Sequence, residues 1–388
     1  MTTLSSSFRE QAERLQPELV AMRRELHQFP ELSNEEYETT KRLRSWLTEA
    51  GIHLLDLGLP TGVLAEVKGA HPGPTIMLRA DIDALPVTED TGLPYASTIP
   101  GRMHACGHDF HTASMIGAAK LLQANAGELH GTVRILFQPA EEQAVGARAV
   151  IEAGALEGVS AVFGMHNKPE LPVGTVGIRT GPLMASVDRF EINVTGRGGH
   201  AGIPEAAVDP IVVSSAIVTA LQTLISRNIS PHHSAVVSIC RFEAGSSWNV
   251  IPDRGVLEGT VRTFQPEARE SIPGHMKRVV ENVAAGYGAE AQLNWTSMLP
   301  AVNNDPKMAE IMNTAAAAQG LNVVEAVPTM GGEDFALYQE RLPGCFIWMG
   351  TGGTEQWHHP RFTLKEEAIS ISAALFAEAA VCALKSLG

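Results

Sequence analysis

Cysteine is scarce in this chain of 388 residues, and the few thiols form no framework. The four cysteines are Cys106, Cys240, Cys345 and Cys382, and no two of them make a CxxC pair. This usage argues against a disulfide-stapled secreted fold and is typical of a reducing compartment. Three of the four lie in apolar runs and are expected to be packing residues. Cys106 differs from them because it lies among potential metal ligands.

Clusters of positive charge are also missing. The chain carries 43 acidic and 29 basic side chains, which gives a net charge of -14, and no run of Lys or Arg stands out. That balance argues against nucleic acid or an anionic membrane as a partner. Residues 1–30 contain no apolar core of signal-peptide length, and no stretch approaches ~18 uninterrupted apolar residues. We therefore expect a cytoplasmic protein with no membrane partner.

The length and the hydrophobic content of 44% allow more than one core, so two domains are expected. Apolar strand-like runs begin at Thr75 ("TIMLRAD"), Thr132 ("TVRILFQPA") and Val159 ("VSAVFGMH"), and helical patterns separate them. Continuous apolar runs that alternate with helices indicate an α/β domain, in which helices cover both faces of a mostly parallel sheet.

Polar residues follow each of these runs where the predicted strand ends. Asp81 and Asp83 follow the first, Glu141 and Glu142 the second, and His166 ends the third. Ligands of such sheets bind beyond the carboxyl ends of the strands. The sequence therefore predicts one site at that edge.

A different pattern occupies residues 184–297. In "SVDRFEINVTG" apolar and polar residues alternate, which is the period of a half-buried strand. The segment continues as helix, strand, strand, helix and strand, the order of a ferredoxin-like unit. We therefore expect an inserted α+β domain at 184–297, and a discontinuous catalytic domain made of 1–183 and 298–388. No internal repeat or low-complexity segment is found.

The stretch "HACGHDFHTA", residues 104–113, allows three interpretations. A structural zinc knot would need a second ligand pair at short spacing with more thiols, and none is nearby. A nucleophilic Cys106 would need a base and an orienting partner, for which the neighbouring histidines are candidates. The third interpretation is half of a catalytic metal centre. Paired glutamates after a strand favour it, because one can bind an ion while the other takes a proton from water.

A series of short blocks, in order along the chain, extends this third interpretation to a family. They are "RRELHQFPELSNEEYET", "RADIDALPV", "HACGHDFHTA", "FQPAEE", "GMHN", "GRGGHAGIPEAAVDPI", "NVIPD", "GTVRTF", "GGEDFA" and "HHPRF". With them the chain resembles the two-metal aminoacylase and carboxypeptidase-type metallohydrolases. It is most similar to the N-acyl-amino-acid amidohydrolases, which include hippurate hydrolases and auxin-conjugate hydrolases. The resemblance covers nearly the whole chain.

The resemblance implies two divalent metal ions per subunit. The ligands that match the family pattern are Cys106, His108, Glu142, His166 and His358. It implies that the Cys106 sulfur bridges the ions and that Glu141 is the general base and acid. His358 is preferred over His359 because the family's ligand is followed by one small residue or His and then by Pro. Asp81 replaces a metal-binding histidine of the wider family, so its contact with metal stays open, and Asp83 is expected to orient a ligand.

The inserted segment resembles the dimerisation domain of the family, so a homodimer is implied. His200 in "GRGGHAG" matches the histidine that reaches into the partner's active site and stabilises the tetrahedral oxyanion. Asn249 and Arg262 match residues that contact the carboxylate of the substrate, for which a guanidinium is well suited. The alternative for Arg262 is a solvated position on a strand face.

The expected reaction is metal-dependent hydrolysis of N-acyl-L-amino acids of acetyl, benzoyl or indole-acetyl type. Three alternatives remain: a carboxypeptidase or dipeptidase acting on short peptides, a cysteine hydrolase with Cys106 as nucleophile, and a binding protein without turnover. The metal stays open among Mn, Zn, Co and Ni. A thiolate suits zinc, whereas carboxylates and imidazoles also accept the others.

Overall fold

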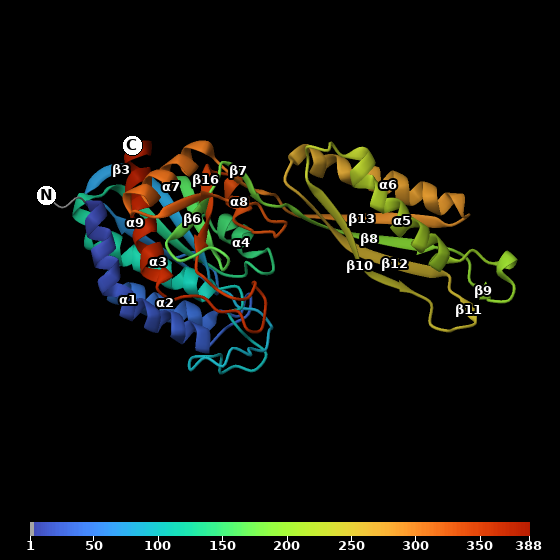
Figure 1. The fold of residues 1–388 in the computed structure, drawn as a ribbon, viewed down its shortest axis with the longest axis horizontal. Coiled ribbons are helices and arrows are strands. Elements are labelled where there is room, and N and C mark those ends of the chain that lie inside the picture. Colours follow the sequence, from blue (N-terminus) through green and yellow to red (C-terminus); the bar gives the residue numbers. More distant parts are fainter. Residues whose placement is uncertain (1–3) are drawn as a thin grey trace. The chain divides into compact units, whose positions relative to one another are not determined.

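The computed structural model describes residues 4–388, with side chains from Phe8 onward. The chain folds into two compact units (Figure 1). The first unit contains the chain up to Leu183 together with Asn303–Val327 and Asp334–Gly388. The second unit contains Met184–Val302 and Pro328–Glu333.

An eight-stranded sheet forms the centre of the first unit, in the order β1-β2-β4-β3-β5-β16-β6-β15. Its strands are β1 (His53–Leu55), β2 (Val63–Lys68), β3 (His71–Asp81), β4 (His130–Gln138), β5 (Val159–Lys168), β6 (Thr175–Ile178), β15 (Asn322–Glu325) and β16 (Gly344–Gly350). The pairs β3–β4, β3–β5, β5–β16 and β6–β15 are parallel. The pairs β1–β2, β2–β4 and β6–β16 are antiparallel.

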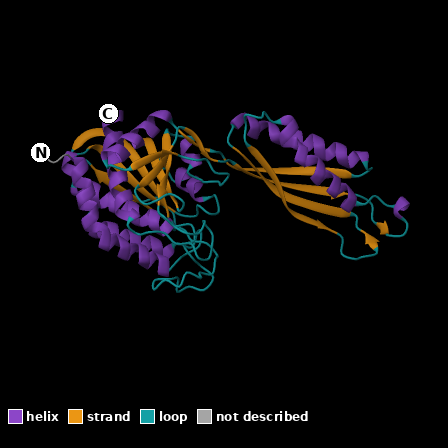
Figure 2. Cartoon of the chain, in the orientation of Figure 1, coloured by secondary structure: helices purple, strands orange, loops and turns teal. Residues whose placement is uncertain are grey.

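Helices cover both faces of this sheet (Figure 2). They are α1 (Leu4–Gln28), α2 (Tyr37–Glu49), α3 (His108–Ala124), α4 (Gly146–Glu152), α7 (Pro306–Ala318), α8 (Ala336–Gln339) and α9 (Ala368–Leu387), with a 3-10 turn at Ala126–Glu128. Contacts join α9 to α1, α3 and α7 in one layer, and α4 to α8 in another. Strand β16 is buried on both sides: Ile347 lies in the core shared with α9, while Phe346 packs against Phe335, which immediately precedes α8.

The second unit is a four-stranded antiparallel sheet in the order β10-β12-β8-β13, with two long helices. Its elements are β8 (Val187–Thr195), β9 (Gly199–His200), a 3-10 turn (Pro204–Ala206), α5 (Pro210–Asn228), β10 (Ala235–Ala244), β11 (Val250–Ile251), β12 (Arg254–Thr263), α6 (Pro266–Gly286) and β13 (Glu290–Leu299). Along β8 the side chains of Phe190, Ile192 and Val194 are buried against the helices, as the period of two predicts. The short strands β9 and β11 pair with each other.

A further pair of strands, β7 (Gly181–Met184) and β14 (Val302–Asn304), lies where the chain passes between the units. The predicted fold class is confirmed in both its parts: an α/β unit with a mostly parallel sheet, and an α+β unit whose main elements follow the ferredoxin-like order.

Two helices of the described chain, α5 and α9, are long and apolar enough to cross a membrane by length and composition. In α9, 83% of the most apolar window is buried inside the protein, and the helix belongs to the core of the first unit. In α5, Val213, Ile217 and Leu221 pack into the core of the second unit. Both helices are therefore accounted for as packed elements of folded units.

Candidate metal centre

Strands β3, β4 and β5 and helix α3 bring polar side chains to one edge of the large sheet. β3 ends at Asp81 and β4 at Gln138, and these residues are register partners in a parallel pair. β5 carries His166 near its end, and α3 begins at His108. Because neighbouring parallel strands end together, residues far apart in the sequence meet at this edge.

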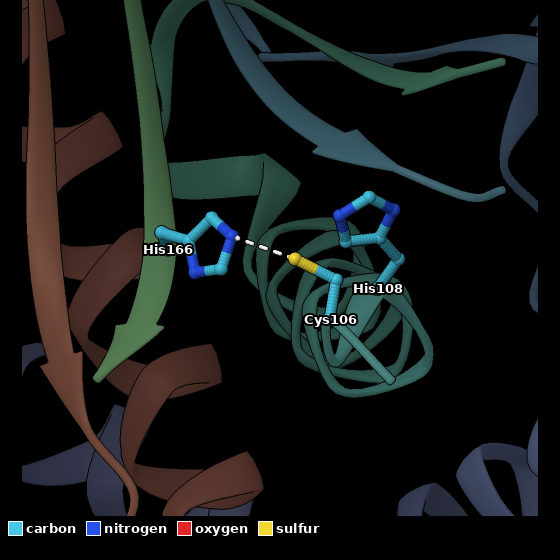
Figure 3. A group of neighbouring side chains, drawn as sticks. All are labelled: Cys106, His108 and His166. Carbon is cyan, nitrogen blue, oxygen red and sulfur yellow. Dashed lines mark hydrogen bonds between the residues drawn. The ribbon is translucent and has the colours of Figure 1, made fainter. Parts of the chain in front are cut away.

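Cys106, His108 and His166 form the first group of possible metal ligands (Figure 3). Their donor atoms lie within 4.8 Å of one another, and all three side chains are buried. Cys106 Sγ lies 3.3 Å from His166 Nε2. Gly107 lies in the turn that opens α3 and has a φ of 84°. A Cβ there would come within 2.4 Å of the Asn167 side chain, so this close turn requires glycine.

Both histidines direct Nε2 into this group because Nδ1 is engaged elsewhere. His166 Nδ1 lies 2.9 Å from the carbonyl oxygen of Asn167, which can only accept, so Nδ1 carries the proton. His108 Nδ1 donates to Asp83 Oδ1 over 3.1 Å. The other ring nitrogen of a neutral imidazole then has a free lone pair. Asp83 thus lies against the far side of a possible ligand, where an orienting carboxylate acts.

Cys106, Glu142 and His358 form the second group, which shares the thiol with the first. Glu142 Oε1 lies 3.6 Å from His358 Nε2 and 3.8 Å from His108 Nε2. One sulfur therefore lies within reach of two sets of donors. This arrangement matches a pair of ions with a shared ligand, for which metal–metal spacings of about 3.5–4 Å are usual.

The two histidines near the end of the chain differ in position. The backbone amide of His358 donates to the carbonyl oxygen of Ala105 over 2.8 Å, which brings its loop against the turn that carries Cys106. His359 Nδ1 lies 3.9 Å from Glu355 and accepts the backbone amide hydrogen of Arg361. The structure thus brings His358 to the other candidate ligands and gives His359 different neighbours.

The unpaired atoms of this cluster provide a test of whether metal ions fit it. Among the residues that the structure describes, His108 Nε2 and Glu142 Oε1 are buried and have no hydrogen-bond partner. Buried polar atoms without partners are costly, and a cation between them would remove the cost. The thiol, imidazole and carboxylate donors are those that zinc and the neighbouring divalent transition metals take. The residues present therefore fit divalent metal ions.

Negative charge dominates the electrostatics of the site. Burial lowers the pKa of His108, but Asp81 and Asp83 outweigh burial and raise it to about 10, so a metal ion at Nε2 would take the place of a proton there. Burial raises the pKa of the Cys106 thiol well above its usual value, and the nearby glutamates, Glu142 and Glu141, raise it further. A nucleophilic cysteine needs a lowered pKa instead. The surroundings of Cys106 therefore favour a cation and disfavour an unassisted thiolate.

Asp81, whose contact with metal the sequence left open, is already engaged by two neighbours. Asp81 Oδ1 lies 2.6 Å from His111 Nδ1, and its Oδ2 accepts from Arg79 Nη1 over 2.7 Å. Burial alone would raise its pKa, but His108, His111 and Arg79 hold it well below the usual range. Asp81 Oδ2 lies 3.7 Å from His108 Nε2, so this carboxylate lies at the border of the site.

Several residues that support the site were not identified from the sequence. Arg79 joins Asp81 to Asp334 through Nη2, over 2.7 Å. Asn167 donates through Nδ2 to the carbonyl oxygen of Cys106 over 2.6 Å, and its backbone amide donates to His111 Nε2 over 2.9 Å. The available signals were an arginine within the apolar run "TIMLRAD" and the Asn that directly follows His166.

The other predicted site residues lie in the second unit. His200 is exposed on β9, where its Nδ1 accepts the amide hydrogen of Gly202. Asn249 directly precedes β11, the strand that pairs with β9. Arg262 lies on β12, and its Nε donates to the hydroxyl of Thr260 over 3.1 Å. Burial of this half-buried guanidinium lowers its pKa.

A mixed set of thiol, imidazole and carboxylate donors at the carboxyl edge of an α/β sheet, beside paired glutamates, defines a hydrolase of the metal-dependent type. Comparison with known proteins identifies the family of this hydrolase. The family model "Peptidase family M20/M25/M40" matches residues 77–381. The chain belongs to this family, as the motifs indicated.

Individual relatives cover almost the whole chain. An N-acetylcysteine deacetylase of Bacillus subtilis (strain 168) is 60% identical over 95% of this chain and 97% of its own. The IAA-amino acid hydrolase ILR1-like 5 of Arabidopsis thaliana is 39% identical over 93% of this chain and 86% of its own. Among solved structures, the YXEP protein of Bacillus subtilis, described as a dinuclear metal binding peptidase of the M20 family, matches with a TM-score of 0.89. It is 56% identical and covers 96% of this chain and 99% of its own.

Proposed function

We propose that this enzyme hydrolyses the amide bond of N-acyl-L-amino acids and releases a carboxylic acid and a free amino acid. The observation that carries the proposal is the pair of donor groups that share Cys106. One of these groups contains Glu142, which directly follows Glu141. The acyl-amino-acid chemistry is supported by the deacetylase and the IAA-amino acid hydrolase among the relatives.

Five residues would hold two divalent ions. Cys106 would be common to both, with His108 and His166 on one side and Glu142 and His358 on the other. The dinuclear metal binding of the related solved structure supports the same count. Bound there, the ions would polarise the acyl carbonyl and lower the pKa of a water molecule. Mn, Zn, Co and Ni all suit this donor set.

Glu141 is the proposed general base. It lies next to Glu142, and its carboxylate is within 4.8 Å of donor atoms of His108 and Glu142. In the proposed reaction Glu141 takes a proton from water while the water oxygen bonds to the acyl carbon. When the carbon–nitrogen bond breaks, Glu141 returns that proton to the leaving amine nitrogen. Asp83 keeps His108 in the tautomer with a free Nε2.

Residues of the second unit would complete the site. We assign stabilisation of the tetrahedral oxyanion to the partner subunit's His200, and binding of the substrate carboxylate to Asn249 and Arg262. Arg262 supports this role because its guanidinium is half-buried and its hydrogen bond to Thr260 is made through Nε. The proposed catalytic domain comprises residues 1–183 and 298–388, and the proposed inserted domain comprises residues 184–297.

The inserted part is also the proposed dimerisation domain. Strand β10 is an edge of its sheet, and an unpaired edge is a template for another chain. Exposed apolar side chains of the second unit include Phe242 on this strand, Ile211 and Val212 in the first turn of α5, and Trp248 in the loop between β10 and β11. Scattering and gel filtration should give a dimer for the wild type, whereas Phe242→Glu should shift it toward monomer and lower the activity that depends on the partner subunit's His200. A wild-type monomer would contradict this arrangement.

All four cysteines are free, which supports a reducing, cytoplasmic setting.

The decisive test of the reaction is a substrate panel with metal-stripped and reloaded protein. N-acetyl, N-benzoyl and N-indoleacetyl amino acids are compared with dipeptides after addition of Mn, Zn, Co or Ni. We expect metal-restored release of free amino acid from one acyl class. Faster turnover of dipeptides would favour a peptidase. Activity that survives stripping and is lost on alkylation would favour Cys106 as nucleophile.

A further inference from the structure

The turn that follows β4 carries both glutamates of the proposed site in an unusual backbone conformation. Ala140 and Ala144, on either side of Glu141 and Glu142, have φ values of 52° and 56°. This left-handed region is unfavourable for a residue with a Cβ. The turn is closed by hydrogen bonds from the amides of Ala144 to Glu141 and of Gly146 to Ala140. Such a turn persists only where its surroundings hold it.

A buried carboxylate from the beginning of the chain holds one end of this turn. Glu36, at the start of α2, is fully buried, and its Oε1 accepts the amide hydrogen of Ala140 over 2.8 Å. Its Oε2 has no hydrogen-bond partner among the described residues. Burial raises the pKa of Glu36, while the amides of Glu36 itself and of Ala140 lower it. This buried carboxyl group therefore contacts the turn through the amide of Ala140.

Neighbours of Glu36 reach the same turn. Ser33 donates to Asp83 Oδ2 over 2.6 Å, and the same oxygen accepts the amide hydrogen of Glu142 over 3.0 Å. Asn34 Nδ2 donates to Gln143 Oε1 over 3.3 Å. Three residues, here called the N-terminal bracket, therefore hold the turn at Ala140, Glu142 and Gln143, directly or through Asp83: they are Ser33, Asn34 and Glu36.

We propose that Glu36 is a positioning residue for Glu141: by holding the amide of Ala140 it fixes the left-handed turn from which the catalytic carboxylate projects. The inference rests on the proposed function, in which Glu141 is the base. Glu36 itself does not contact substrate or reacting atoms. Its loss should therefore lower the rate of the chemical step, while substrate binding and metal content change little.

The variants separate positioning from folding. Glu36→Leu removes the acceptor, Glu36→Gln keeps an acceptor oxygen without the charge, and Glu36→Asp shortens the reach. Glu35→Gln is the matched control, because the adjacent Glu35 is exposed and pairs with Arg102 over 2.9 Å. All are compared by melting temperature, bound metal, kcat and KM on an N-acyl amino acid that the wild type hydrolyses. Hydrogen exchange of the peptide 139–145 is measured in the metal-free proteins.

We expect Glu36→Leu to lower kcat on the order of 10- to 100-fold, as small displacements of catalytic groups do, with KM within about threefold. Two metal ions per chain should remain. Glu36→Gln should recover most of kcat, and Glu35→Gln should match the wild type. Exchange of 139–145 should be about tenfold faster in Glu36→Leu, because the turn opens locally.

Unchanged kcat and exchange in a folded Glu36→Leu would overturn the proposal. So would a loss of kcat that follows only a loss of metal or of global stability. If the Leu variant does not fold, Glu36→Asp decides, since wild-type kcat and exchange in that variant would equally overturn the proposal. A wild type that cleaves no N-acyl amino acid would contradict the proposed function instead, and the exchange measurement would still test the bracket.

Discussion

Asp83→Asn is the substitution whose effect the geometry defines most sharply. Asp83 accepts three hydrogen bonds: its Oδ1 from His108 Nδ1, and its Oδ2 from the Ser33 hydroxyl and the Glu142 amide. An asparagine has one acceptor oxygen and one NH2 group. In either orientation of the amide, the NH2 group faces a donor.

Each orientation has a cost at the metal centre. If the NH2 faces His108, the imidazole must accept at Nδ1, which moves its proton to Nε2 and removes the lone pair that would bind metal. If the NH2 faces the amide of Glu142 and Ser33, two donors are left without an acceptor. Loss of such an orienting partner typically lowers metal affinity 10- to 100-fold. This corresponds to about 1.4–2.7 kcal/mol.

The assay is a competition titration of zinc or manganese between the protein and a chelating dye. Asp56→Asn is the matched control: it removes the same charge from an exposed loop, where Asp56 accepts a local hydrogen bond from the amide of Gly58. We expect the control to bind like the wild type. If Asp83→Asn bound metal within about threefold of the wild type, neither orientation would carry the expected cost, and the orienting role of Asp83 at the metal centre would be refuted.

Other substitutions test the remaining parts of the site. Glu141→Gln should lower kcat about 10²- to 10⁴-fold with metal content unchanged, whereas Glu142→Gln should lose bound metal. Kinetics and elemental analysis of the bound metal distinguish the two variants. Equal metal loss in both would contradict the assigned roles. Arg79→Met leaves two buried carboxylates without their cation. It should lower the unfolding free energy by about 3–5 kcal/mol in denaturant titrations. The control Arg9→Met breaks an exposed pair and should lower it by less than about 0.5 kcal/mol. Burial lowers the pKa of His27, but two adjacent carboxylates outweigh it and raise the pKa. The stability that His27 contributes is complete below pH about 6.5 and is lost as the pH rises through the raised pKa. Above neutral pH, the melting temperature of the wild type should therefore fall more steeply than that of His27→Gln.

The position of the site was predictable from the sequence because parallel strands end together. Asp81, Glu142 and His166 each lie at or just after the end of a recognisable apolar run, and the spacing of Cys106 and His108 brings both into one turn. The ferredoxin-like order was predictable for a related reason, since a period of two marks each strand of a half-buried sheet. These signals are local, and each is complete within a short window of sequence.

Contacts between distant segments could not be predicted in the same way. The bond from Ala140 to Glu36 joins residues more than a hundred positions apart, and neither residue type announces it. The order of the sheet beyond β5, with β16 between β5 and β6, depends on long connections that carry no local pattern. The association of Pro328–Glu333 with the second unit is likewise a matter of tertiary packing. Such features depend on which distant surfaces fit together.

The arrangement of the donors along the chain has a consequence for folding. His166 precedes the whole second unit in the sequence and His358 follows it, yet both reach groups that share Cys106. Ions held by all of them would act as a cross-link that closes a very long loop of the unfolded chain, and long loops lose the most entropy on closure. Metal would therefore stabilise the first unit by mass action and also keep the ends of the insertion together. A chain cut before His358 would lack that closure, however well its earlier part folded.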